Sequence, residues 1–303
     1  MLDVFLNVIM PVFVVTGLSA IFQRWRKLSV APLSQTTLWL FSPAFIFNNL
    51  LSQDLAAGAS LRMVGAVSLG ILLMLAITYA VSKALRHSRD TQSAFLLAGG
   101  FPNAGNMGIP VLVLAFGDAG LAPAIIVFVT HSVIGFTVAI WLAARSQLTG
   151  MAPFLQVLKL PAVYAVAAAF LVSGFGWDLP VVISEPIRLL SGAAVPVMLM
   201  VLGFQLGAGV EVQQARSMAT AVFLRLVVSV PLAYLATLAF GLEGLAQGAV
   251  IIVGAMPTAI FTTILATEFK ANPRFLTGVV VAGTAISVVT LTVVITIVRD
   301  LVA

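Results

Sequence analysis

The chain has 303 residues, of which 61% are hydrophobic and 8% are charged, and its formal net charge is +5. Soluble domains carry about 25% charged residues, so this chain has too few charges to cover a globular fold in water. The composition excludes a soluble enzyme and a nucleic-acid-binding domain. A small excess of Lys and Arg in such an apolar chain instead indicates the cytoplasmic side of a membrane protein.

Ten apolar stretches predict ten transmembrane helices, because a membrane helix needs about 20 apolar residues. They lie at residues 2–22, 33–51, 61–83, 91–116, 120–144, 157–175, 182–206, 217–240, 246–268 and 275–298. The turns between them are short and polar. We therefore expect an all-α integral membrane protein that sits in a lipid bilayer and has no soluble domain.

The distribution of charges predicts the orientation. With the N-terminus outside, eleven of the fifteen Lys and Arg residues fall in cytoplasmic loops, including the cluster of Arg24, Arg26 and Lys27. Because the Lys and Arg bias sets the orientation of membrane helices, we expect both termini outside, in the periplasm of a bacterial inner membrane.

The two halves of the chain contain similar segments at corresponding places. Residues 99–104 in the fourth stretch resemble residues 254–259 in the ninth, and Pro43 in the second stretch has a counterpart in Pro196 in the seventh. Two copies of a five-helix unit insert with opposite orientations, which is the inverted-repeat pattern of secondary transporters. The expected repeats are residues 1–145 and 155–303.

The fourth stretch predicts a broken helix. Between Gly99 and Pro110 it holds four Gly, two Pro and two Asn, and these residue types weaken or interrupt a helix. A packing helix with a kink is the alternative, but unwound backbone inside a membrane is typical of a cavity wall. The residues expected at the breaks of the fourth and ninth stretches are Pro102, Gly105, Gly108, Pro110 and Pro257.

Two half-helices that restart in mid-membrane predict an anion site. A half-helix that begins after Pro102, and a second that begins near Pro257, would each present free amides and a partial positive charge. Asn103 and Thr258 occupy the expected N-cap positions, where each side chain either caps the amides or contacts a ligand; we favour a ligand contact for Asn103 and capping for Thr258. Asn106, one turn further, supports either role.

Two ionisable side chains lie inside the predicted helices, where such residues are rare and indicate function. His131 lies near the centre of the fifth stretch, between Thr130 and Ser132. It suits a proton carrier, a substrate contact or a hydrogen bond to a carbonyl of a neighbouring helix. Arg225 in the eighth stretch suits an anchor or a partner for the carbonyl end of a broken helix better than a substrate contact.

No Asp or Glu falls in the central third of any predicted helix, which disfavours cation and proton antiport. The chain has no Cys and two His, so we expect no metal site and no cofactor. No nucleophile–base pair is visible, so an enzyme is not expected.

At these residues the sequence resembles the auxin efflux carrier family, which includes plant auxin carriers and bacterial transporters of malonate and malate. Pro102 with Asn103, and residues 107–110, resemble the family's motif in the fourth helix. The family's pattern in the ninth helix is matched at the same spacing by Pro257, Ile260, Ala266, Glu268, Phe269 and Pro273. Weaker matches are Pro11, Pro43 and Arg225.

This resemblance implies a bile-acid-symporter-like fold in which helices 4 and 9 cross. Helices 1, 2, 6 and 7 would form a scaffold and helices 3–5 and 8–10 a moving transport domain, with homodimers formed through the scaffold. The substrate carboxylate would bind at the crossing point to Asn103. His131 replaces a substrate-contacting Gln of the plant carriers, which implies a different specificity.

The sequence therefore predicts a secondary transporter that moves small organic anions, in the direction of efflux, by an elevator-type movement. Asn103, His131, Asn106 and Thr258 are its expected substrate-binding residues. Arg225, Thr130 and Ser132 are expected in support or coupling. A sodium-coupled organic-anion symporter of the bile-acid type and a membrane ligand sensor are the alternatives.

Overall fold

The computed structural model describes residues 1–51, 57–144, 161–207, 209 and 214–302. The predicted boundary between the two repeats, at 145–155, lies outside the described residues. The charged residues Asp54, Arg145 and Lys159, which entered the predicted orientation, also lie outside them.

The described part of the chain is helical. Its first half contains α1 (Leu2–Val4), η1 (Phe5–Ile9), α2 (Met10–Arg26), α3 (Val30–Thr36), η2 (Thr37–Phe41), α4 (Ser42–Leu51), α5 (Ala57–Ala84), α6 (Arg89–Gly100), η3 (Ala104–Gly108), α7 (Ile109–Phe116), η4 (Gly117–Gly120) and α8 (Leu121–Ala144). Its second half contains α10 (Pro161–Phe175), α11 (Val181–Gly207), α12 (Ala215–Phe223), η5 (Leu224–Val228), α13 (Ser229–Ala239), α14 (Gly244–Gly254), α15 (Phe261–Glu268) and α16 (Pro273–Val302). The all-α prediction is confirmed.

Six helical segments among the described residues are long and apolar enough to cross a membrane. They are Leu2–Arg26, Ser60–Ala84, Ala104–Ala143, Val181–Gly207, Ala215–Ala239 and Pro273–Val302. Val163–Phe175 and Gly244–Gly254 are shorter apolar helices, because one adjoins a stretch outside the described residues and the other stops at a helix break. The count of ten spans and the inverted repeat remain predictions.

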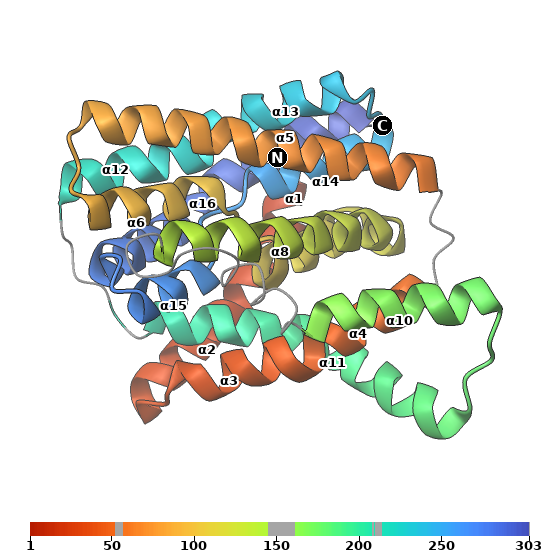
Figure 1. The fold of residues 1–303 in the computed structure, drawn as a ribbon. Helices are drawn as coiled ribbons and strands as arrows, with labels where there is room; N and C mark the ends of the chain where they lie inside the picture. Colours follow the sequence, from red (N-terminus) through yellow and green to blue (C-terminus); the bar gives the residue numbers. More distant parts are fainter. Residues whose placement is uncertain (52–56, 145–160, 208, 210–213, 303) are drawn as a thin grey trace.

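The helices pack in two groups (Figure 1). In the first, which we call the α11 group, α11 packs against α2, α3, η2 and α4, and α10 packs against α4. In the second, which we call the crossover group, α5 packs against α6, α8, α13 and α14, and α16 packs against α6, α12, α14 and α15. The crossover group also includes η3, which packs against α7 and α8, and η5, which packs against α12 and α13. Figure 1 shows α3, α4, α10 and α11 in the lower part of the view and α5, α6, α12 and α13 in the upper part.

Glycine allows the closest helix contact in the α11 group. A Cβ atom on Gly203 would lie 2.3 Å from the Thr16 carbonyl oxygen and 2.5 Å from Ser19 Cβ, and a Cβ on Gly207 would lie 2.6 Å from the Ala20 carbonyl oxygen. These distances are too short for any side chain, so the spacing of the two glycines brings the backbones of α2 and α11 together.

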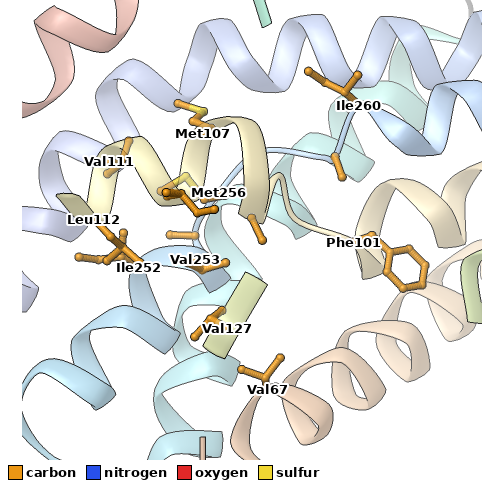
Figure 2. Packing of buried hydrophobic residues seen from close by; sticks show 14 of the residues in the cluster. Val67, Phe101, Met107, Val111, Leu112, Val127, Ile252, Val253, Met256 and Ile260 are labelled. Carbon is orange, nitrogen blue, oxygen red and sulfur yellow. The ribbon is translucent and has the colours of Figure 1, made fainter. Parts of the chain in front are cut away.

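Buried apolar side chains surround the region where α6 and α14 end. Figure 2 shows Val253 of α14 beside Met256, with Met107 of η3 on one side of them and Val127 of α8 and Val67 of α5 on the other. All five side chains are buried. Close packing of this kind resists rearrangement, so the cluster supports the two broken segments.

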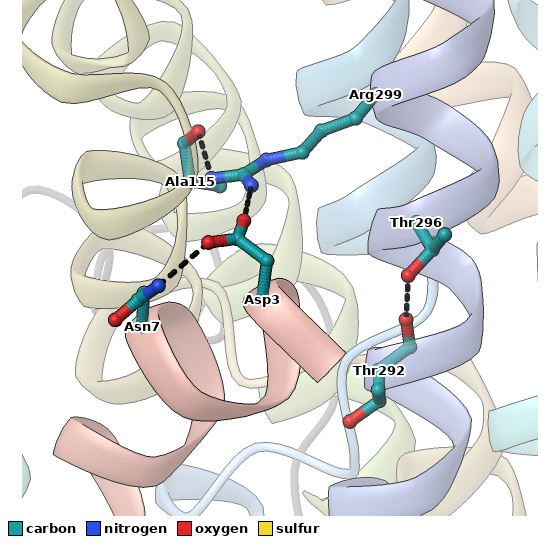
Figure 3. A network of polar contacts seen from close by, with 6 residues as sticks. All are labelled: Asp3, Asn7, Ala115, Thr292, Thr296 and Arg299. Atoms are coloured by element: carbon teal, nitrogen blue, oxygen red, sulfur yellow. Dashed lines mark hydrogen bonds and ion pairs between the residues drawn. The ribbon is translucent and has the colours of Figure 1, made fainter. Parts of the chain in front are cut away.

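The two chain termini meet at one end of the molecule. Arg299 Nη1 lies 2.9 Å from Asp3 Oδ2, and Arg299 Nη2 donates to the Ala115 carbonyl at 2.7 Å, as Figure 3 shows. Asn7 Nδ2 donates to the other oxygen of Asp3 at 2.6 Å. This network joins α1, η1, α7 and α16, and it places both termini on the same side. Which side of the membrane this is remains a prediction.

His87 fastens the turn between α5 and α6 to α12. Its Nδ1 lies 3.0 Å from Ser82 Oγ, its Nε2 lies 2.9 Å from Ser217 Oγ, and its ring packs at 4.9 Å between centroids against Phe95. The residue lies outside the membrane-spanning segments, and burial lowers the pKa of its imidazole. The neutral ring therefore suits this position.

We expect Gly203→Ala to destabilise the protein, because its methyl group would overlap the α2 backbone. Overpacking of this kind costs about 1–3 kcal/mol. Gly192 is the matched control, since it lies on the same helix and a Cβ there has no neighbour within 4 Å. Thermal unfolding midpoints in one detergent compare the two variants. Equal midpoints for Gly203→Ala and Gly192→Ala would contradict the close contact.

We expect the stability of the protein to fall as the pH is lowered below the ordinary pKa of histidine, about 6.5, in part through His87. Its pKa in the folded state lies below the unfolded value, so the unfolded state binds more protons in this range. The stabilisation is complete above the unfolded pKa and is lost as the pH falls toward the folded one. His87→Gln should reduce this slope in unfolding measurements; a variant with the wild-type slope would refute the role of His87.

Candidate functional site

Two extended segments replace helix where the two broken helices meet. α6 ends at Gly100 and η3 begins at Ala104, while α14 ends at Gly254 and α15 begins at Phe261. Between these ends the Asn103 N–H donates to the Pro257 carbonyl at 2.7 Å, and the Ala259 N–H donates to the Phe101 carbonyl at 2.8 Å. The segments thus pair as an antiparallel bridge.

The bridge explains a proline at this place. Pro102 is paired with Thr258, and both hydrogen bonds of the bridge use the neighbouring residues. Because proline has no N–H to donate, it fits a position where the pairing does not require an N–H donor. Pro102 and Pro257 lie in the two segments where helix is interrupted, and the two interruptions pair backbone groups with each other.

The predicted N-cap position of Thr258 is wrong. α15 begins only at Phe261, after an N-cap residue Ile260, because residues 257–259 are used in the pairing with the first break. The Thr258 hydroxyl instead donates to the Ala98 carbonyl at 2.8 Å, and the side chain is buried. Thr258 thus fastens the second break to the end of α6.

Asn103 is the N-cap residue of η3, as the sequence predicts, but its side chain makes no capping bond. The residue is 4% exposed, and its Nδ2 is buried without a hydrogen-bond partner. A buried donor left without a partner costs about 1–3 kcal/mol. Of the two roles that the sequence leaves open, the geometry favours the contact with a ligand.

Asn103 faces a pocket that we call the crossover pocket. Its volume is about 880 Å³ with its open part included. The described residues that line it are Ser34, Thr37, Leu38, Ser42, Pro102, Asn103, Ala104, Gly105, Asn106, Phe128, His131, Ser132, Met198, Val201, Ala259, Ile260, Phe261 and Ile264. None of these side chains is acidic.

Both helix groups contribute to the crossover pocket. Ser34 and Met198 come from the α11 group, and Asn103, Asn106 and His131 come from the crossover group. The Ser34 hydroxyl oxygen is also buried without a partner. Among the described residues that line the pocket, each group therefore contributes one buried polar atom without a hydrogen-bond partner, Ser34 Oγ and Asn103 Nδ2.

His131 borders the crossover pocket and donates from Nδ1 to the Val127 carbonyl of its own helix at 3.0 Å. The predicted alternative of a bond to a neighbouring helix is therefore wrong. A neutral imidazole that donates from Nδ1 presents Nε2 as an acceptor. Thr130 and Ser132 donate to the carbonyls of Ile126 and Phe128, and only Ser132 of these two lines the pocket.

The glycines and the second proline of the fourth stretch shape the restart of the helix. A Cβ on Gly105 would lie 2.8 Å from the Phe128 ring, so glycine lets η3 approach α8. Gly108 donates its N–H to the Asn103 carbonyl at 2.9 Å, and Pro110 lies in the first turn of α7, where a missing N–H is tolerated. Asn106 lines the pocket beside them.

Arg225 donates hydrogen bonds to the carbonyl ends of α6 and α14, the half-helices that precede the two breaks. Its Nη1 donates to the Gly99 carbonyl at 2.7 Å, and its Nη2 donates to the Gly254 carbonyl. The side chain is 3% exposed and lies in η5, a π-helical turn, a feature that is frequent at functional sites. The predicted pairing with a helix carbonyl end is thus seen at two ends at once.

Several lining residues escape prediction from the sequence. Ser34, Thr37, Ser42 and Met198 reach the pocket from helices of the α11 group. Nothing in their residue types marks them, because the face that a membrane helix turns inward depends on its packing. The described residues contain no group of His, Cys, Asp and Glu that is suited to a metal ion.

No curated protein matches the chain. A family model described as "Membrane transport protein" matches residues 4–295, nearly the whole chain. The chain therefore belongs to this family, the auxin efflux carrier family.

Proposed function

We propose that the protein is a secondary transporter that moves small organic anions across a bacterial inner membrane, in the direction of efflux. One observation carries the proposal: the buried, unpaired Nδ2 of Asn103 lies in a pocket at the crossing of two broken helices. A carboxylate oxygen is the acceptor that this donor lacks. The apolar, acid-free lining suits an anion with a hydrocarbon part.

The helix ends support an anion at this place. η3 starts after Asn103, beside the pocket, so the positive end of this half-helix faces the space in which a carboxylate would bind. α15 starts at Phe261, which also lines the pocket. The negative ends of α6 and α14 point instead to Arg225. The crossing therefore separates its positive ends from its negative ends.

The division into two helix groups supports an elevator-type movement. We propose that the α11 group is the scaffold of predicted helices 1, 2, 6 and 7, and that the crossover group is the transport domain of helices 3–5 and 8–10. The pocket lies between the groups, as a site with alternating access requires. We further propose two inverted repeats at 1–145 and 155–303, both termini in the periplasm, and a homodimer formed through the scaffold.

Asn103→Ala tests the carboxylate site. Malonate, malate and indole-3-acetate should raise the unfolding temperature of the wild type, since a ligand at about 100 times its Kd stabilises by about 2.7 kcal/mol. The alanine variant should lose about tenfold or more in affinity, because a hydrogen bond to a charged group contributes about 1.5–3 kcal/mol.

Asn48→Ala is the matched control, because Asn48 lies on α4 and does not line the pocket. It should bind the acids as the wild type does. If Asn103→Ala stays folded and keeps the wild-type affinity for the acids that bind, Asn103 is not the carboxylate ligand.

We expect His131 to contact the part of the substrate beyond the carboxylate. Its Nε2, an acceptor in the neutral ring, pairs with a hydroxyl or an N–H of the substrate. Malate and succinate differ by one hydroxyl, so their ratio of affinities measures this contact. We expect His131→Leu to reduce any preference for malate by about tenfold, since an unpaired buried acceptor is costly. A wild-type ratio in the variant would exclude the contact.

A further inference from the structure

At the crossing, the carbonyl ends of two half-helices point to a single cation. The guanidinium of Arg225 donates to the Gly99 carbonyl at 2.7 Å and to the Gly254 carbonyl, which belong to the last residues of α6 and α14. The cavity around it, of about 350 Å³ with its open part included, has no acidic side chain among the described residues. The negative ends of the two helices are therefore the partners of its charge.

In secondary transporters, the carbonyl ends of discontinuous helices and nearby unwound carbonyls are the groups that bind a coupling cation. Here these oxygens already accept from a cation that is part of the chain. A sodium ion at this place would have to displace the guanidinium from its two carbonyls. It would also bring a second positive charge close to the first, and like charges repel strongly at short distance where water is excluded.

The same guanidinium lies beside the proposed anion site. Its cavity and the crossover pocket share two lining residues, Pro102 and His131, so the two spaces lie on either side of the first broken segment. A buried anion is costly unless a positive charge offsets it. Arg225 supplies that charge within the crossover group, where it lies in η5 and donates to carbonyls of α6 and α14.

We propose that Arg225 is a tethered counter-cation, which takes the place of a dissociable coupling ion at the two carbonyl ends. It stays with the crossover group throughout the cycle, and the organic anion crosses without an inorganic cation bound beside it. This inference rests on the proposed function, because it assigns the coupling of the same site. It distinguishes the protein from the sodium-coupled alternative by the hydrogen bonds of Arg225 to the two carbonyl ends.

Uptake by the intact protein in proteoliposomes tests the proposal without any variant. Labelled malonate, malate and indole-3-acetate are offered in sodium, potassium or choline salts on both sides, at equal ionic strength. We expect uptake rates in the three salts that agree within about twofold, because equal ionic strength gives equal screening of charges. Uptake that requires sodium or potassium would overturn the tethered cation and leave the proposed function standing. No uptake of any acid in any salt would count against the proposed function itself.

Arg225→Ala tests the residue. Uptake should fall by about tenfold or more, because two buried carbonyl ends lose a charged donor. Guanidinium at about 20 mM, far below the molar concentrations that denature proteins, should restore part of the rate, and the neutral analogue urea should not. Rescue by an alkali cation would also support the proposal, since a free ion would then occupy the vacated place.

Arg62→Ala is the matched control, because Arg62 donates to the Gly241 carbonyl on the exposed surface. Its uptake should be unchanged and insensitive to guanidinium. Arg225→Lys keeps the cation and serves where the alanine variant does not fold; it should retain uptake that is independent of sodium. A folded alanine variant that no cation rescues, or a lysine variant that needs sodium, would overturn the proposal.

Discussion

Backbone amides and carbonyls inside a bilayer must find partners within the protein, because lipid offers none. Two broken membrane helices therefore leave backbone groups that the rest of the structure has to bind. The extended segments pair with each other through the N–H groups of Asn103 and Ala259. Arg225 donates to carbonyls at the ends of α6 and α14, and Thr258 donates to a carbonyl near the end of α6. These backbone hydrogen bonds therefore need both broken helices, and neither helix can satisfy its break alone.

The carbonyl ends of the broken helices and the donor groups beside the pocket are not paired to the same extent. The carbonyl ends are bound by a fixed cation, while the Asn103 side chain faces the crossover pocket with its Nδ2 unpaired. The proposed anion site rests on this unsatisfied donor, and none of the described residues that line the pocket is Lys or Arg. The low charge of the chain, which at first excludes a soluble fold, is consistent with recognition by backbone dipoles and amides.

The sequence predicted what depends on local chemistry. The helix break at Pro102, the restart at Asn103 and the pairing of Arg225 with a carbonyl end follow from proline, glycine and a buried charge. The position of Thr258 was mispredicted because the pairing of residues 257–259 is a contact between distant parts of the chain. Ser34 and Met198 were missed for the same reason: the rotation of each membrane helix is set by its neighbours, and one sequence does not reveal it.

Ser34 and Asn103 also connect the pocket to motion. Each presents an unpaired buried polar atom to the crossover pocket, and they belong to different helix groups. A ligand that bonds to both stabilises the arrangement in which the groups face each other in this way. In the proposed elevator-type movement, Asn103 would travel with the ligand and Ser34 would stay behind, so the α11 group would contribute to binding in one state only. Such a difference in affinity between states is what allows a substrate to shift the equilibrium between them.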